Sequence, residues 1–96
     1  MNNSNHHTQP LPILIRQRRI QLRLTQELIA EALRITPEAV GNWERGVRRI
    51  ELSKTPRLAK LLSLHVPDFC RYVLREYHPA LAVALFDEPA AEQQAD

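Results

Sequence analysis

The chain has 96 residues, 44% of them hydrophobic, and a formal net charge of +2, which fits one small globular domain. Its single cysteine, Cys70, excludes an internal disulfide framework and fits a reducing compartment. No segment approaches the length of a membrane span, and the first ten residues lack the hydrophobic run of a signal peptide, so we expect a cytoplasmic protein.

The charge is distributed unevenly along the chain. Residues 10–60 hold eleven Arg or Lys residues and five acidic residues, a net charge of +6, whereas residues 61–96 have a net charge of −4. The basic part favours a surface that faces a polyanion. Charge alone leaves chance segregation as an equally good explanation.

The first predicted elements are a polar, disordered arm over residues 1–10 and two helices. Apolar spacing predicts one helix over about 11–23 and another over 25–33, with Thr25 as its N-cap. Only the three residues RIT separate the second helix from the next one. Such a tight connection predicts an αα-hairpin or a helix-turn-helix.

The third predicted helix, residues 37–45, has two different sides. Thr36 and Pro37 form an N-cap followed by proline, and Gly46 suits the left-handed residue after a last turn. At about 100° per residue, Val40 and Trp43 share the apolar side. The opposite, polar side carries Glu38, Asn42 and Arg45, with Gly41 at its border.

Three further helices are predicted in the C-terminal half. Thr55 and Pro56 repeat the cap-plus-proline pattern before a helix over about 56–64. Pro67 begins a helix to about Tyr77, and PALAVALF, residues 79–86, forms a short apolar helix. The tail, residues 87–96, is expected to be disordered.

The stretch RRIQLRLTQELIAEALRITPEAVGNWERG, residues 18–46, resembles the Cro/cI family of helix-turn-helix DNA-binding proteins, the lambda-repressor-like domains. The resemblance is carried in register by Thr25-Gln26, Ala30, Leu33, Ile35-Thr36, Val40 and the WERG ending. It covers about residues 11–66. It implies an all-α fold, a compact five-helix DNA-binding domain, here extended over 67–86 by a C-terminal helix or helical hairpin. In this family the third helix lies in the DNA major groove.

The resemblance also implies roles for individual residues. Thr25 and Gln26 match positions where the second helix meets a phosphate, and Arg19 and Glu44 match an internal salt bridge. The remaining positions implied to face bases or phosphates are Thr36, Pro37, Glu38, Asn42, Arg45, Arg48 and Arg49.

Several of these side chains also have a simpler explanation, and Arg19 and Glu44 are otherwise two exposed charges with negligible coupling. Asn42 is the first candidate for base reading because a carboxamide pairs bidentately with adenine, but it is otherwise a solvated amide. Glu38 either accepts from cytosine or stabilises the helix N-terminus. Helix initiation accounts fully for Pro37, and Arg48 and Arg49 are otherwise solvated charges.

Two positions depart from ordinary expectation. Arg34 stands at a turn position that is often glycine, so we expect it to adopt a left-handed conformation at some cost. Gly41 weakens a helix relative to alanine. We interpret it as letting the helix backbone approach DNA or a partner closely.

The sequence therefore predicts a duplex-DNA-binding transcriptional regulator, a repressor that acts as a homodimer on a palindromic operator. No metal site is expected, because the His, Cys and Glu spacing matches no standard ligand pattern. No catalytic group or cofactor is expected either, because no nucleophile, base and orienting group converge recognisably and there is no glycine-rich phosphate loop. Residues 67–86 either complete the core or form the dimer interface. Two alternatives remain: an antitoxin that binds a toxin protein and represses its own operon, and a protein-interaction module that has lost DNA binding.

Overall fold

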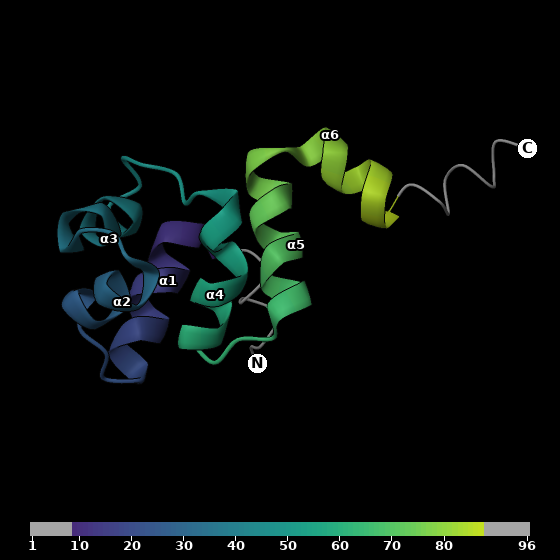
Figure 1. Ribbon diagram of the computed structural model, residues 1–96. Helices are drawn as coiled ribbons and strands as arrows, with labels where there is room; N and C mark the ends of the chain where they lie inside the picture. The colour runs from purple at the N-terminus through teal and green to yellow at the C-terminus, as the bar shows by residue number, and fades with distance from the viewer. Residues whose placement is uncertain (1–8, 88–96) are drawn as a thin grey trace, which may run out of the picture.

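The computed structural model describes residues 9–87, and these form helices and turns without a strand. The helices are α1 (Leu11–Gln21), α2 (Gln26–Leu33), α3 (Pro37–Glu44), α4 (Thr55–Leu61), α5 (Val66–Tyr77) and α6 (Pro79–Ala82), with a 3-10 turn η2 (Leu52–Lys54) and a π-helical segment η3 (Val83–Asp87) (Figure 1). The predicted all-α class, five helices with a C-terminal helical addition, is confirmed. Most of the predicted arm (1–10) and tail (87–96) lies outside the described residues.

Local signals set the ends of α2 and α3 as the sequence predicts. Thr25 Oγ1 accepts a hydrogen bond from Leu28 N at 3.0 Å, and Thr36 Oγ1 accepts one from Ala39 N at 3.1 Å. Each hydroxyl thereby satisfies one of the N–H groups that a first helical turn leaves free. Gly46 follows α3 with a φ of +76°, a conformation that glycine adopts without steric cost.

Boundaries of α1 and α4 differ from the prediction, and α4, predicted to run to about residue 64, ends at Leu61. α1 ends at Gln21 because Arg23 takes a left-handed conformation with a φ of 59°. α4 begins at Thr55 itself, because the residues of η2 just before it already have a helical backbone. Thr55 Oγ1 donates to Glu51 O at 3.2 Å instead of capping α4. The prediction of Thr55 as an N-cap is therefore wrong.

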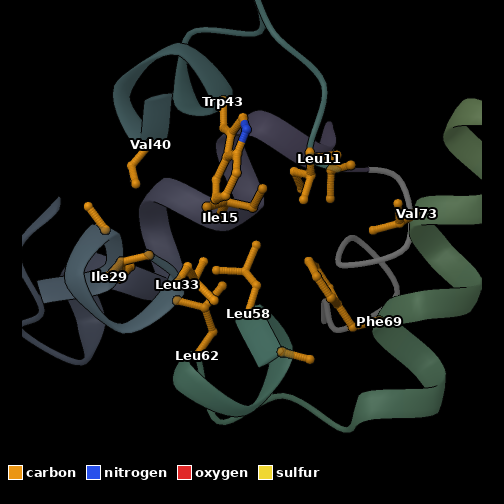
Figure 2. Packing of buried hydrophobic residues seen from close by; sticks show 13 residues of the cluster. Leu11, Ile15, Ile29, Leu33, Val40, Trp43, Leu58, Leu62, Phe69 and Val73 are labelled. Atoms are coloured by element: carbon orange, nitrogen blue, oxygen red, sulfur yellow. The ribbon is translucent and has the colours of Figure 1, made fainter. Parts of the chain in front are cut away.

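The core forms where α1 to α5 face one another. Trp43 points from α3 onto Ile15 of α1, and Phe69 and Val73 point inward from α5 (Figure 2). Burial of this apolar surface is the main force that holds the helices together. The core side chains, none more than 4% exposed, are Leu11, Ile15, Ile29, Ala30, Leu33, Val40, Trp43, Ile50, Leu58, Ala59, Leu62, Phe69 and Val73.

α5 and α6 relate differently to this core. α5 packs along α4 and contributes Phe69 and Val73 to it. α6 lies beyond α5, on the side away from α1 and α3 (Figure 1), and Ala82 is its buried residue. Apolar side chains between 37% and 55% exposed follow one another along α6 and η3: Leu81, Val83, Leu85 and Phe86. The C-terminal part of the chain thus comprises a helix of the core and an exposed apolar segment.

Candidate nucleic-acid interface

α2 and α3 form a helix-turn-helix unit whose turn depends on one left-handed residue. Arg34 follows α2 with φ 61° and ψ 47°. Ile35 N then donates to Ala30 O at 3.0 Å, which closes the end of α2. A residue with a Cβ meets a steric cost in this conformation. The expected left-handed geometry of Arg34 is confirmed, and the turn forms despite its cost.

α3 has a buried side and a surface side. Val40 and Trp43 are 0% and 2% exposed and lie against the core. Trp43 is therefore a core residue and is not available to stack on a base. The structure leaves the other side chains of interest at the surface: Thr36, Pro37, Glu38 and Arg45 are exposed, and Asn42 is half-buried.

Asn42 and Arg45 form one unit on this surface. Arg45 Nη2 donates a hydrogen bond to Asn42 Oδ1, one turn earlier on α3. A bidentate contact with adenine uses both the acceptor and a donor of the carboxamide. Because a carboxamide oxygen has two lone pairs, the bond from Arg45 leaves Oδ1 one further acceptor position.

The carboxylate of Glu44 joins α1, α2 and α3. Arg19 donates to it twice, from Nε to Oε2 at 2.6 Å and from Nη2 to Oε1 at 3.0 Å, and Gln26 Nε2 donates to Oε1 at 3.1 Å. The Arg19 and Glu44 side chains are only 13% and 3% exposed. The hydrogen bond to Glu44 raises the pKa of Arg19 above its ordinary value, against the effect of burial. The ion pair is thus part of the structure of the domain and not of its outer surface.

Gly41 faces this network. A Cβ on Gly41 would lie 3.2 Å from Arg45 Nη1 and 3.6 Å from Gln26 Nε2, and Gly41 itself is buried. Glycine does permit a close approach here, but the approaching side chains belong to α2 and α3 of the same chain. The interpretation that Gly41 lets the backbone approach DNA or a partner is therefore corrected.

Gln26 links the two positions at which phosphate contacts are expected. Thr25 and Gln26 stand at the start of α2, where free N–H groups and the helix dipole favour an anion. Through Glu44, Gln26 is tied to the end of α3. The start of α2 and the residues that follow α3 are consequently held in a fixed relation.

The basic loop, residues 47–50, follows α3 and carries Arg48 and Arg49 at the surface. Arg48 Nη2 lies 3.3 Å from Glu51 Oε2, with both side chains about half exposed. An ion pair this exposed contributes little to stability, so Arg48 exchanges it readily for another anion. The guanidinium of Arg49 lies over the ring of Tyr77, 4.8 Å from its centroid.

Two sets of long-range contacts were not predicted from the sequence, and only the first involves the basic loop. Tyr77 Oη accepts a hydrogen bond from Ile50 N at 2.9 Å, which connects α5 to the basic loop. Arg18 donates to Leu62 O at 2.8 Å and to Ser63 O at 3.2 Å, at the C-terminal end of α4. Both link residues far apart in the sequence, and no local pattern signals them. Arg18 therefore serves the fold and adds less to the basic surface than its charge indicates.

The surface around α3 presents hydroxyl, amide and guanidinium groups and the carboxylate of Glu38. Within residues 9–87, no cluster of three or more His, Cys, Asp or Glu side chains could hold a metal ion. None of the helices in that range is long and apolar enough to cross a membrane.

Comparison with known proteins agrees with this geometry. The sequence model of a helix-turn-helix family of the Cro/cI type matches residues 15–69. The match runs from the middle of α1 to the first turn of α5 and includes all of α2, α3 and α4. No curated protein and no solved structure matches the chain.

Proposed function

The chain belongs to the Cro/cI-type helix-turn-helix family of DNA-binding regulators, and we propose that it is a repressor that binds a palindromic operator in double-stranded DNA as a homodimer. The observation that carries the proposal is the two-sided α3, fixed to the core by Val40 and Trp43 with Asn42 at its surface. The major groove of B-DNA admits one α-helix, and base edges there present a distinct pattern of donors and acceptors.

In this proposal phosphate contacts position the domain and α3 reads the bases. The start of α2, at Thr25 and Gln26, receives one phosphate. Arg45, Arg48 and Arg49 bind others along the same strand or across the groove. The bound protein blocks access to the promoter, and no catalytic step is involved. The protein acts in the cytoplasm, at the nucleoid.

Selection of bound sequences from random duplex DNA tests this proposal. The protein is expected to enrich two half-sites about one helical turn apart, as a two-fold dimer requires. Its affinity for the selected site should fall steeply with salt, with a slope of about −0.9 for each phosphate neutralised. No enriched sequence, or an affinity that salt leaves unchanged, would point to an interaction module that has lost DNA binding.

Single substitutions separate base reading from phosphate contact. Asn42→Ala is expected to weaken binding to the selected site by about 1–3 kcal/mol and to relax the preference at one base. Arg48→Ala should weaken binding to all sequences alike and make the salt slope shallower, reducing its magnitude by about one. The control, Arg71→Ala, removes the same charge from α5, which lies across the molecule from α3 (Figure 1). Equal effects of Arg71→Ala and Arg48→Ala would contradict the assigned surface.

The homodimer part of the proposal rests on α6 and η3. Their apolar side chains Leu81, Val83 and Leu85 are 48%, 47% and 55% exposed and form one continuous stretch of chain. Exposed apolar surface of this kind is typical of a protein-binding face. A second copy of the chain satisfies it symmetrically, as a two-fold dimer on a palindrome requires.

Leu81→Glu is expected to convert the dimer into a folded monomer, measured by sedimentation velocity. Ile20→Glu on α1 is the matched control, because Ile20 is 49% and Leu81 48% exposed. A wild-type protein that stays monomeric on its selected DNA would rule out the homodimer. If that monomer instead binds a second protein through the face that Leu81→Glu disrupts, the antitoxin alternative gains support.

A further inference from the structure

Residues 47–49 of the basic loop cross a hollow, whereas Ile50 at the end of the loop packs in the core. The hollow is lined by the first turns of α1 and by Trp43 of α3, and Val47 in the loop is 69% exposed. The buried Nε1 of Trp43 has no hydrogen-bond partner among the described residues, so no loop carbonyl is tied to it. The Ile50 side chain, 3% exposed, packs in the core and anchors the second end of the loop, so the position of residues 47–49 over the hollow depends on how the two ends are held.

The two ends of the loop are held by different helices. At the first end, Val47 N donates to Asn42 O of α3 at 3.0 Å. At the second end, Ile50 N donates to Tyr77 Oη at 2.9 Å. Tyr77 is the last residue of α5. The basic loop is thus hydrogen-bonded to α3 at one end and to the last residue of α5 at the other.

The same tyrosine also holds a cationic side chain of the loop. The guanidinium of Arg49 lies 4.8 Å from the centroid of the Tyr77 ring. A guanidinium over an aromatic ring is attracted by the negative face of the ring. One side chain of α5 therefore orients both the backbone at Ile50 and the head group of Arg49.

We propose that Tyr77 is a positioning residue for the basic loop, which pre-orders Arg48 and Arg49 for phosphate contact and makes DNA affinity depend on the end of α5. The inference rests on the proposed function, because phosphate binding is what gives this loop a ligand. Ordering cationic side chains before the complex forms reduces the conformational entropy lost on binding. α6 begins at Pro79, so a protein bound to α6 acts close to the residue that holds the loop.

Amide hydrogen exchange of the free protein tests the positioning without DNA. Tyr77→Phe keeps the ring and removes the hydroxyl oxygen that accepts from Ile50 N, so exchange at Ile50 should accelerate at least about fivefold. Tyr72→Phe is the matched control: Tyr72 also lies on α5, and its hydroxyl donates to Gln9 O. Unchanged exchange at Ile50 in Tyr77→Phe would overturn the inference.

DNA binding tests the consequence. Tyr77→Phe is expected to weaken binding to the selected duplex about fivefold while Tyr72→Phe leaves it unchanged. Tyr77→Leu also removes the aromatic ring on which Arg49 lies. It should weaken binding further and reduce the magnitude of the salt slope by about one. Thermal unfolding confirms that each variant is folded at the temperature of the titration.

The outcomes distinguish this inference from the proposed function. If the wild-type protein shows no salt-dependent binding to duplex DNA, the proposed function fails, and the role of Tyr77 in it fails as well. If the wild-type protein binds and Arg48→Ala weakens it, but both Tyr77 variants bind like the wild type, the inference alone is overturned. A steeper dependence of affinity on salt in Tyr77→Leu would also overturn the inference, because the tyrosine would then be keeping Arg49 away from DNA.

Discussion

Replacing Arg19 with methionine is expected to lower the free energy of unfolding by about 3–5 kcal/mol, because it leaves a buried carboxylate without its cation. The side chain of Glu44 is 3% exposed and receives two hydrogen bonds from Arg19. Methionine retains an unbranched apolar stem, so the loss reports on the charge and the hydrogen bonds of the guanidinium, which include one to Leu24 O at 3.0 Å. The total free energy of unfolding of a small domain is only about 5–15 kcal/mol. Urea denaturation measures this loss as a lower transition midpoint, with an unchanged dependence of the unfolding free energy on urea concentration.

A double-mutant cycle shows whether the two charges are coupled. The double variant Arg19→Met/Glu44→Met buries no unpaired charge, so it should be less destabilised than the sum of the single variants. The control cycle uses Arg48 and Glu51, whose side chains are 48% and 46% exposed. Their coupling should stay below about 1 kcal/mol. Additive effects at Arg19 and Glu44 would show that the buried pair contributes nothing as a pair.

The helix-turn-helix could be predicted from the sequence because its determinants are local. The hydroxyls of Thr25 and Thr36 reach N–H groups only three residues ahead, and Gly46 needs only its own backbone freedom. Such signals lie within one helical turn and are visible in a single sequence. The family match over 15–69 confirms the resemblance that residues 18–46 carry.

The interpretations that failed depend on what lies opposite a residue in space. Gly41 sits at the border of the polar side of α3 by periodicity, but periodicity does not show that Gln26 packs there. Thr55 reads as a cap by its place before Pro56. It is not one because the preceding 3-10 turn supplies a helical backbone in advance.

The candidate interface could be predicted in outline only. Helical spacing separates Val40 and Trp43 from Asn42 and Arg45, and the observed exposures agree. Spacing does not give the hydrogen bond between Asn42 and Arg45, which depends on side-chain conformation. The contact of Tyr77 with the basic loop depends on how α5 packs against the rest of the domain, and a local pattern does not contain it.

Phe69→Ala is expected to lower the free energy of unfolding by about 3–5 kcal/mol. The Phe69 ring is 4% exposed and points from α5 into the core (Figure 2). Phe86→Ala is the matched control, because Phe86 is 37% exposed. Its ring lies at the surface under the guanidinium of Arg71, 4.9 Å from the ring centroid. That substitution should cost less than about 1 kcal/mol.

The comparison of the two phenylalanines places the end of the folding unit. The family match ends at residue 69, in the first turn of α5. Val73, which is 0% exposed and lies beyond the match, packs in the same core. A large loss for Phe69→Ala and Val73→Ala but not for Phe86→Ala would put the boundary after α5 and not at residue 66. Small losses at all three positions in urea denaturation would instead make α5 an addition that the domain does not need in order to fold.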